Sequence, residues 1–197
     1  MDHPFIPSLH DYFGENRSWW LVTDYVEGST IEDLIFHDGH VFSHREVVEW
    51  TLQLMDPVQH VHSKGFVHLD LRIPNIIIKE GDLYLIDFGL AQSLTDTPLA
   101  IDSKEKADNR NSKLLKPANI QSDLFDIGHF MLFMLYSGYT PEDDSKETTW
   151  SQELKLPESL RQVLYKLLEE QEPYRCSTDL INDLNSILAD SDSLHSS

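Results

Sequence analysis

The fold is decided by residues 66 to 89, which read Phe-Val-His-Leu-Asp-Leu-Arg-Ile-Pro-Asn-Ile-Ile-Ile-Lys-Glu-Gly-Asp-Leu-Tyr-Leu-Ile-Asp-Phe-Gly. Residues 76–78 and 83–86 are two short apolar runs, and the turn-forming residues 80–82 lie between them. This pattern predicts two antiparallel strands joined by a tight turn. Such a hairpin places Asn75 and Asp87 at the same end, with Asp70 beside them.

These three side chains all carry oxygen atoms at the end of a rigid element. A hard divalent cation such as Mg²⁺ prefers oxygen ligands and keeps some of its waters. The sequence therefore predicts a magnesium site formed by the end of the hairpin and the loop before it.

The segment His-Leu-Asp-Leu-Arg-Ile-Pro-Asn, residues 68–75, resembles the catalytic loop of the protein kinases. The later triplet Asp-Phe-Gly, residues 87–89, resembles their metal-binding triplet, and the two motifs have the family's order and separation. The resemblance implies that Asp70 orients the acceptor hydroxyl and takes its proton, while Asn75 and Asp87 hold Mg²⁺ on the phosphates of ATP. It also implies that Arg72 replaces the Lys that neutralises the transferred phosphoryl group in Ser/Thr kinases, and that His68 packs behind the triplet.

Residues 21–28, Leu-Val-Thr-Asp-Tyr-Val-Glu-Gly, resemble the kinase hinge. The resemblance implies that the Asp24 carbonyl and the Val26 amide face adenine. It further places Thr30 near the ribose and Ile77 as the apolar floor under the base. A strand that runs into a glycine turn would explain Gly28 equally well.

The rest of the chain predicts one mainly helical unit. Strands are expected over residues 4–13 and 19–24, with a turn at 14–17. Because a two-stranded ribbon is only marginally stable alone, it is expected to pack against another element. A capping box at residues 43–46 starts a buried helix that ends near residue 63. Other helices are expected over residues 31–36, 123–136, 156–168 and 178–188.

The expected fold class is α+β, mainly α, with a protein-kinase-like large (C-terminal) lobe over residues 30–189. Residues 1–29 would be the hinge and a remnant two-stranded hairpin of the small lobe, and residues 190–197 a disordered tail. The resemblance implies that Asp123 holds the catalytic loop through backbone amides. It makes residues 90–118 the activation segment, whose usual closing Ala-Pro-Glu is absent, so that Arg175 lacks its usual partner.

The amino-acid composition restricts the kinds of partner that the chain can bind. The 15 basic and 34 acidic side chains give a net charge of −19, which argues against nucleic acid and anionic membranes as partners. Cys176 is the single cysteine, and no apolar run is long enough to span a bilayer, so a cytoplasmic protein is expected. The resemblance implies ATP and Mg²⁺ as cofactors and a protein substrate.

Two elements of the family's phosphate-binding machinery are not found in residues 1–197. There is no Gly-x-Gly-x-x-Gly, and the first lysine, Lys64, already follows the long helix. We therefore expect a truncated Ser/Thr protein kinase that is weak or inactive alone, with a partner supplying the missing small-lobe elements. A non-catalytic pseudokinase module and a small-molecule phosphotransferase of the aminoglycoside or choline type are the alternatives.

Overall fold

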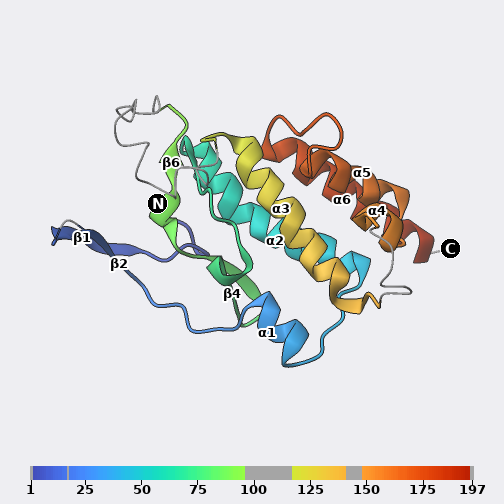
Figure 1. Cartoon of the computed structure of the whole chain (residues 1–197), viewed down its shortest axis with the longest axis horizontal. Helices are drawn as coiled ribbons and strands as arrows, with labels where there is room; N and C mark the ends of the chain where they lie inside the picture. Colours follow the sequence, from blue (N-terminus) through green and yellow to red (C-terminus); the bar gives the residue numbers. More distant parts are fainter. Residues whose placement is uncertain (1, 17, 96–116, 141–147, 196–197) are drawn as a thin grey trace.

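The computed structural model describes residues 2–16, 18–95, 117–140 and 148–195, with side chains as far as residue 192. Helices form the body of the molecule, and a two-stranded ribbon projects from one side of it (Figure 1). The sheets in the described part of the chain each contain two strands. The expected α+β, mainly α architecture is confirmed.

The ribbon consists of β1 (Leu9–Glu15) and β2 (Ser18–Thr23), which pair antiparallel. The expected strand boundaries were wrong by several residues, because Gly14 still pairs with Trp19 and the chain reverses after Glu15, at Asn16 with φ 51°. Every residue of both strands is exposed. The expected packing of the ribbon against another element is therefore slight among the described residues. The ribbon is held mainly by the backbone pairing of β1 with β2.

Two helices follow, each started by a capping box. In α1 (Ile31–Phe36) the box is formed by Thr30 and Asp33, and in α2 (His44–Ser63) by Ser43 and Glu46. Such reciprocal hydrogen bonds satisfy backbone amides that have no partner inside the helix. The predicted start and end of α2 are confirmed.

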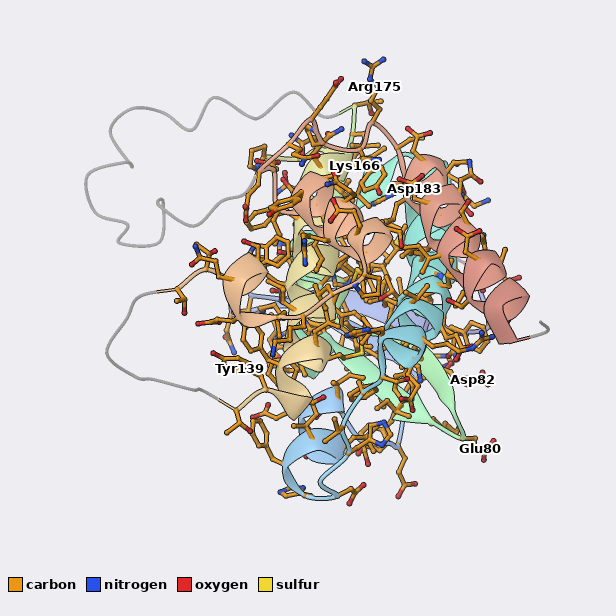
Figure 2. The ribbon with its side chains drawn as sticks, turned by 90° about the vertical axis from the view of Figure 1, so that its right-hand side faces the viewer. Glu80, Asp82, Tyr139, Lys166, Arg175 and Asp183 are labelled. Atoms are coloured by element: carbon orange, nitrogen blue, oxygen red, sulfur yellow. The ribbon has the colours of Figure 1, made fainter. Side chains whose placement is uncertain are left out.

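The central hairpin joins β4 (Ile76–Lys79) to β5 (Asp82–Leu85), as the sequence predicted. Its turn has positive φ at Glu80 (55°) and Gly81 (91°), which matches the twist of a two-residue hairpin. Figure 2 shows Glu80 and Asp82 at the tip, away from the helices. A second short pair, β3 (Phe66–Val67) with β6 (Gln92–Ser93), brackets the catalytic loop, and the short 3-10 turns η1 (Ile73–Asn75) and η2 (Phe88–Leu90) precede β4 and β6.

The C-terminal half is helical, with α3 (Ile120–Leu135), η4 (Tyr136–Gly138), α4 (Trp150–Glu153), α5 (Glu158–Leu167) and α6 (Ser177–His195). The expected end of the last helix and the expected disordered tail from residue 190 were wrong for residues 190–195. Asp192 forms an ion pair with Arg45 of α2 at 2.5 Å, which joins this last part of α6 to the body, and the Ser191 hydroxyl donates to the Ile187 carbonyl within the helix.

One core joins these elements. Side chains of α2, α3, α5 and α6 pack against one another and against the apolar face of the central hairpin, with Leu54, Met55, Ile76, Leu85, Ile127 and Met131 fully or almost fully buried. No helix within the described ranges has both the length and the apolar character to cross a membrane. Most of the expected activation segment, residues 96–116, lies outside the described residues.

Candidate active site

Asp70 is the fixed point of the catalytic loop, residues 68–75. The Arg72 guanidinium donates two hydrogen bonds to its carboxylate, from Nε to Oδ1 and from Nη2 to Oδ2 at 3.0 Å. The Asn75 Nδ2 donates to Asp70 Oδ2 at 2.7 Å and to the Asp70 carbonyl at 2.9 Å. Asp70 is only 9% exposed. The structure thus brings three of the predicted site residues together and fixes the direction of the carboxylate.

The charge state of Asp70 follows from these contacts. Burial raises the pKa of its carboxyl, but the hydrogen bonds from Arg72 and Asn75 outweigh burial, so the pKa lies below its ordinary value of 3.8. The group is therefore ionised at neutral pH and can accept a hydrogen bond from a hydroxyl. Because a low pKa makes a carboxylate a weak base, it is better suited to orient a hydroxyl than to deprotonate it in advance.

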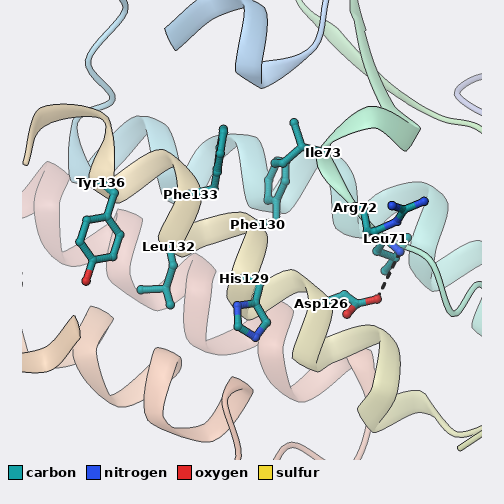
Figure 3. Close-up of a pocket in the computed structure, with 9 residues that line it drawn as sticks. All are labelled: Leu71, Arg72, Ile73, Asp126, His129, Phe130, Leu132, Phe133 and Tyr136. Atoms are coloured by element: carbon teal, nitrogen blue, oxygen red, sulfur yellow. Dashed lines mark hydrogen bonds between the residues drawn. The ribbon is translucent and has the colours of Figure 1, made fainter. Parts of the chain in front are cut away.

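Side chains in the first two turns of α3 accept hydrogen bonds from the backbone of the loop. Asp123, which is 0% exposed, accepts hydrogen bonds from the His68 amide (2.8 Å) and the Leu69 amide (2.7 Å), which confirms its expected role. One turn later, Asp126 accepts from the Leu71 amide at 3.3 Å, drawn as a dashed line in Figure 3. Two carboxylates on one helix therefore accept hydrogen bonds from three of the four backbone amides of residues 68–71, and the exception is the amide of Asp70.

His68 supports the end of the hairpin, as the resemblance implied. Its ring packs on Phe88 with a centroid separation of 4.7 Å, and its Nε2 lies 3.1 Å from the Ile86 carbonyl. Burial lowers the pKa of His68 below 6.5, so the ring is neutral at neutral pH. A neutral ring donates from Nε2 to the carbonyl and accepts the Asp70 amide at Nδ1, 3.3 Å away.

The hairpin end also fits a cation. The Ile86 amide donates to the Asn75 carbonyl at 3.0 Å, so Asp87 follows directly opposite Asn75. Because Nδ2 of Asn75 makes both of its hydrogen bonds to Asp70, the amide oxygen is left as a ligand. Asp87 is exposed, and its Oδ1 accepts only from the nearby Gly89 amide among the described residues. One amide oxygen and one carboxylate suit Mg²⁺ that keeps waters and phosphate oxygens.

A cavity of about 620 Å³ extends from Asp87 to the ribbon. Its lining includes the predicted residues Asp24, Val26 and Ile77. The Asp24 carbonyl and the Val26 amide have no hydrogen-bond partner within the described ranges. Gly28 is required where this wall crosses the hairpin, because a Cβ there would lie 2.2 Å from the Ile78 carbonyl oxygen. The cavity has the size and the mixed apolar and polar lining of a cofactor site.

Two predicted residues are placed elsewhere. Thr30 is not among the described residues that line the cavity, and its hydroxyl is occupied by Asp33 in the cap of α1. The structure gives Thr30 a capping role, and its expected place near a ribose stays a prediction. Arg175 is paired with Glu172 at 3.2 Å, and both side chains are more than four-fifths exposed; Figure 2 shows Arg175 at the molecular surface.

On the other side of Arg72 an open groove of about 530 Å³ runs along α3. Figure 3 shows its apolar lining of Ile73, Phe130, Leu132, Phe133 and Tyr136, with Asp126 and His129 as polar neighbours. The groove therefore begins at Arg72, the residue that holds the Asp70 carboxylate.

The sequence interpretation missed several supporting residues. Asp126 lies three residues after Asp123, a spacing that puts both on one helix face, so this signal was available. His62 also contacts Asp123, and Ser177 contacts His62. Nothing local in the sequence indicates the second contact, because Ser177 and His62 are 115 positions apart.

Comparison with known proteins agrees with this geometry. A family model described as the protein kinase domain matches residues 1–193. The chain is 34% identical over 183 residues to the probable serine/threonine-protein kinase YbdM of Bacillus subtilis, covering 93% of this chain and 66% of that protein. It is 30% identical over 156 residues to serine/threonine-protein kinase PrkC of the same organism and 32% identical over 111 residues to human Nek11. The matches cover 73% and 50% of this chain, but only 22% and 17% of those two relatives.

Proposed function

The chain belongs to the protein kinase domain family, and from this premise we propose that it acts in ATP-dependent phosphoryl transfer to Ser or Thr hydroxyls of a protein. The observation that carries the proposal is the ionised Asp70, fixed by Arg72 and Asn75, together with the separate cavity that extends from Asp87 to Asp24 and Val26. The chain spans less than two thirds of each relative compared above, so the activity, substrates and partners of a longer protein are part of this proposal.

Each predicted residue has a proposed role. Asp70 accepts the hydrogen bond of the acceptor hydroxyl, and Arg72 places positive charge beside it. Asn75 and Asp87 would hold Mg²⁺, which supplies electrostatic stabilisation of the phosphate charge. The Asp24 carbonyl and the Val26 amide would read the adenine edge, and Ile77 would lie under the base. The groove along α3 supports a polypeptide acceptor.

Residues 1–197 supply few of the groups that contact the phosphates of ATP in this family. Residues 1–197 contain no Gly-x-Gly-x-x-Gly and no lysine before Lys64, so these two family elements are not supplied by them. Loss of a single preorganised donor costs on the order of 10²–10³-fold in rate. We therefore propose that these groups come from sequence or a partner outside residues 1–197, and that these residues alone transfer phosphate slowly. The same observation favours a second candidate, a non-catalytic pseudokinase module.

The single cysteine and the large acidic excess support a cytoplasmic setting for either candidate. Neither feature favours one candidate over the other, so nucleotide binding must decide between them.

Nucleotide-dependent thermal unfolding tests the proposal. Mg-ATP at ten times its Kd should stabilise the chain by about 1.4 kcal/mol, a Tm increase of about 3–6 °C. Asp87→Asn should lose the magnesium-dependent part of this shift, and Asp82→Asn at the exposed hairpin tip is the matched control. Asp70→Asn should keep the shift but reduce phosphoryl transfer by about 10²–10⁴-fold. Failure of the wild type to respond to nucleotide with Mg²⁺ would favour the non-catalytic module.

A further inference from the structure

A buried chain of side chains connects the far helix α6 to the catalytic loop. The Ser177 Oγ, at the first residue of α6, lies 2.5 Å from His62 Nδ1. The opposite ring nitrogen, Nε2, lies 2.8 Å from Asp123 Oδ2. Ser177 is 3% exposed, and the His62 and Asp123 side chains are 5% and 0% exposed. Three helices, α6, α2 and α3, each contribute one member.

Counting hydrogens assigns the direction of these bonds. An ionised carboxylate only accepts hydrogen bonds, so His62 Nε2 must carry the hydrogen that is shared with Asp123. The Ser177 hydroxyl can then donate to Nδ1, which leaves His62 as the tautomer with its hydrogen on Nε2. The bond to Asp123 therefore sets the tautomer of His62, because a serine hydroxyl can either donate or accept. Ser177 instead fixes the orientation of the His62 ring by holding its opposite nitrogen.

Asp123 passes this constraint to the loop. Its Oδ2 accepts from both His62 and the His68 amide, and its Oδ1 accepts from the Leu69 amide. Leu69 has φ +64°, a left-handed conformation that is unfavourable for a leucine and persists only where its surroundings hold it. Asp70 follows directly, so a rotation of the Asp123 carboxylate would release the residue that aims Asp70.

We propose that Ser177 and His62 are positioning residues for the catalytic loop. Ser177 holds the orientation of the His62 ring, His62 holds the Asp123 carboxylate, and Asp123 holds Leu69 and thereby the direction of Asp70. The structural part of this proposal needs no catalysis. Its consequence for phosphoryl transfer rests on the function proposed above.

The first test measures the loop without nucleotide. In the full chain, Ser177→Ala should shift the ¹⁵N resonances of the His62 ring and speed hydrogen exchange of the His68 and Leu69 amides by about 5-fold, the effect of one net hydrogen bond. The Leu71 amide is the internal control because Asp126 holds it instead. Ser177→Thr keeps the hydroxyl and should restore wild-type values. Thr178→Ala removes the neighbouring hydroxyl, which lies 3.3 Å from Gln59, and should change neither amide.

Two results would overturn the proposal: unchanged His62 nitrogen shifts in Ser177→Ala, or an equal rise in exchange at Leu71, which would indicate a general loss of stability. If the chain transfers phosphate, Ser177→Ala should lower kcat and leave KM for ATP unchanged, since the hinge is not involved. A chain that transfers no phosphate would contradict the proposed function while the exchange experiment still decides the positioning role.

Discussion

The two walls of the candidate site are held in very different ways. The catalytic loop rests on the buried carboxylate of Asp123 and on Asp126, and its central residue Asp70 is 9% exposed. The ribbon that forms the opposite wall has no buried residue, and Trp19 is 79% exposed. The molecule therefore fixes the side of the site with Asp70 by its core and leaves the opposite side to a pair of strands.

This difference has a dynamic consequence. Regions with few buried apolar contacts open locally at a small free-energy cost, whereas core elements open only with global unfolding. A two-stranded ribbon is marginal without packing on another element. We expect the ribbon and the catalytic loop to belong to different cooperative units, and three substitutions test this comparison.

The largest effect is expected for Asp123→Ala on the helical side. The substitution leaves His62 and two loop amides without their acceptor, and removing one partner of such a buried charged network costs about 3–5 kcal/mol. Urea denaturation measures the loss. Asp190→Ala, on the exposed side of α6, is the control and should stay within about 0.5 kcal/mol. A loss below about 1 kcal/mol for Asp123→Ala would mean that the core does not hold the loop.

An intermediate loss of stability, measured as a lower thermal midpoint, is expected for Gly28→Ala. Gly28 lies where the segment after the ribbon crosses the core hairpin. Ser29 and Ile78 exchange backbone hydrogen bonds at 3.1 and 2.7 Å, and an alanine Cβ at position 28 would collide with the Ile78 carbonyl and the Ile77 side chain. Overpacking of this kind costs about 1–3 kcal/mol. In Gly14→Ala, within the ribbon, the new Cβ would meet only Trp19 at an ordinary 3.4 Å, so its thermal midpoint should hardly change. Equal effects of the two alanines would remove the distinction between crossing and ribbon.

Elements with a local signal could be predicted from the sequence. Two apolar runs and a Glu-Gly turn predict the central hairpin, and the capping box predicts the start of α2. The placement of Asp70, Asn75 and Asp87 at one end follows from that hairpin. Thr30 shows a local signal that was overlooked, because a Thr three residues before an Asp caps a helix, and this competes with a role in binding.

Features that depend on tertiary packing could not be predicted. The contact of Asp126 with the loop spans 55 residues and that of Ser177 with His62 spans 115, so only the packed helices bring them together. The exposure of the ribbon was missed for the same reason, since the continuous Trp-Trp-Leu-Val run of β2 is typical of a packed strand. The helical continuation of α6 to His195 is accompanied by the contact of Asp192 with Arg45, which the polar composition of the tail does not indicate.

The smallest effect is expected for Trp20→Ser in the ribbon. Trp20 is 54% exposed and lies opposite Phe13, and a cross-strand pair contributes about 0.2–1 kcal/mol. The loss should appear as about 1.4–5-fold faster hydrogen exchange of the ribbon amides, while the global free energy of unfolding changes by less than about 0.5 kcal/mol. Trp50→Ser is the matched substitution on α2, where the ring packs on Phe42 at 5.4 Å and against the core, and it should lower global stability by about 2 kcal/mol or more. If Trp20→Ser lowered global stability as much as Trp50→Ser, the ribbon would unfold together with the core, and the two walls of the site would form one cooperative unit.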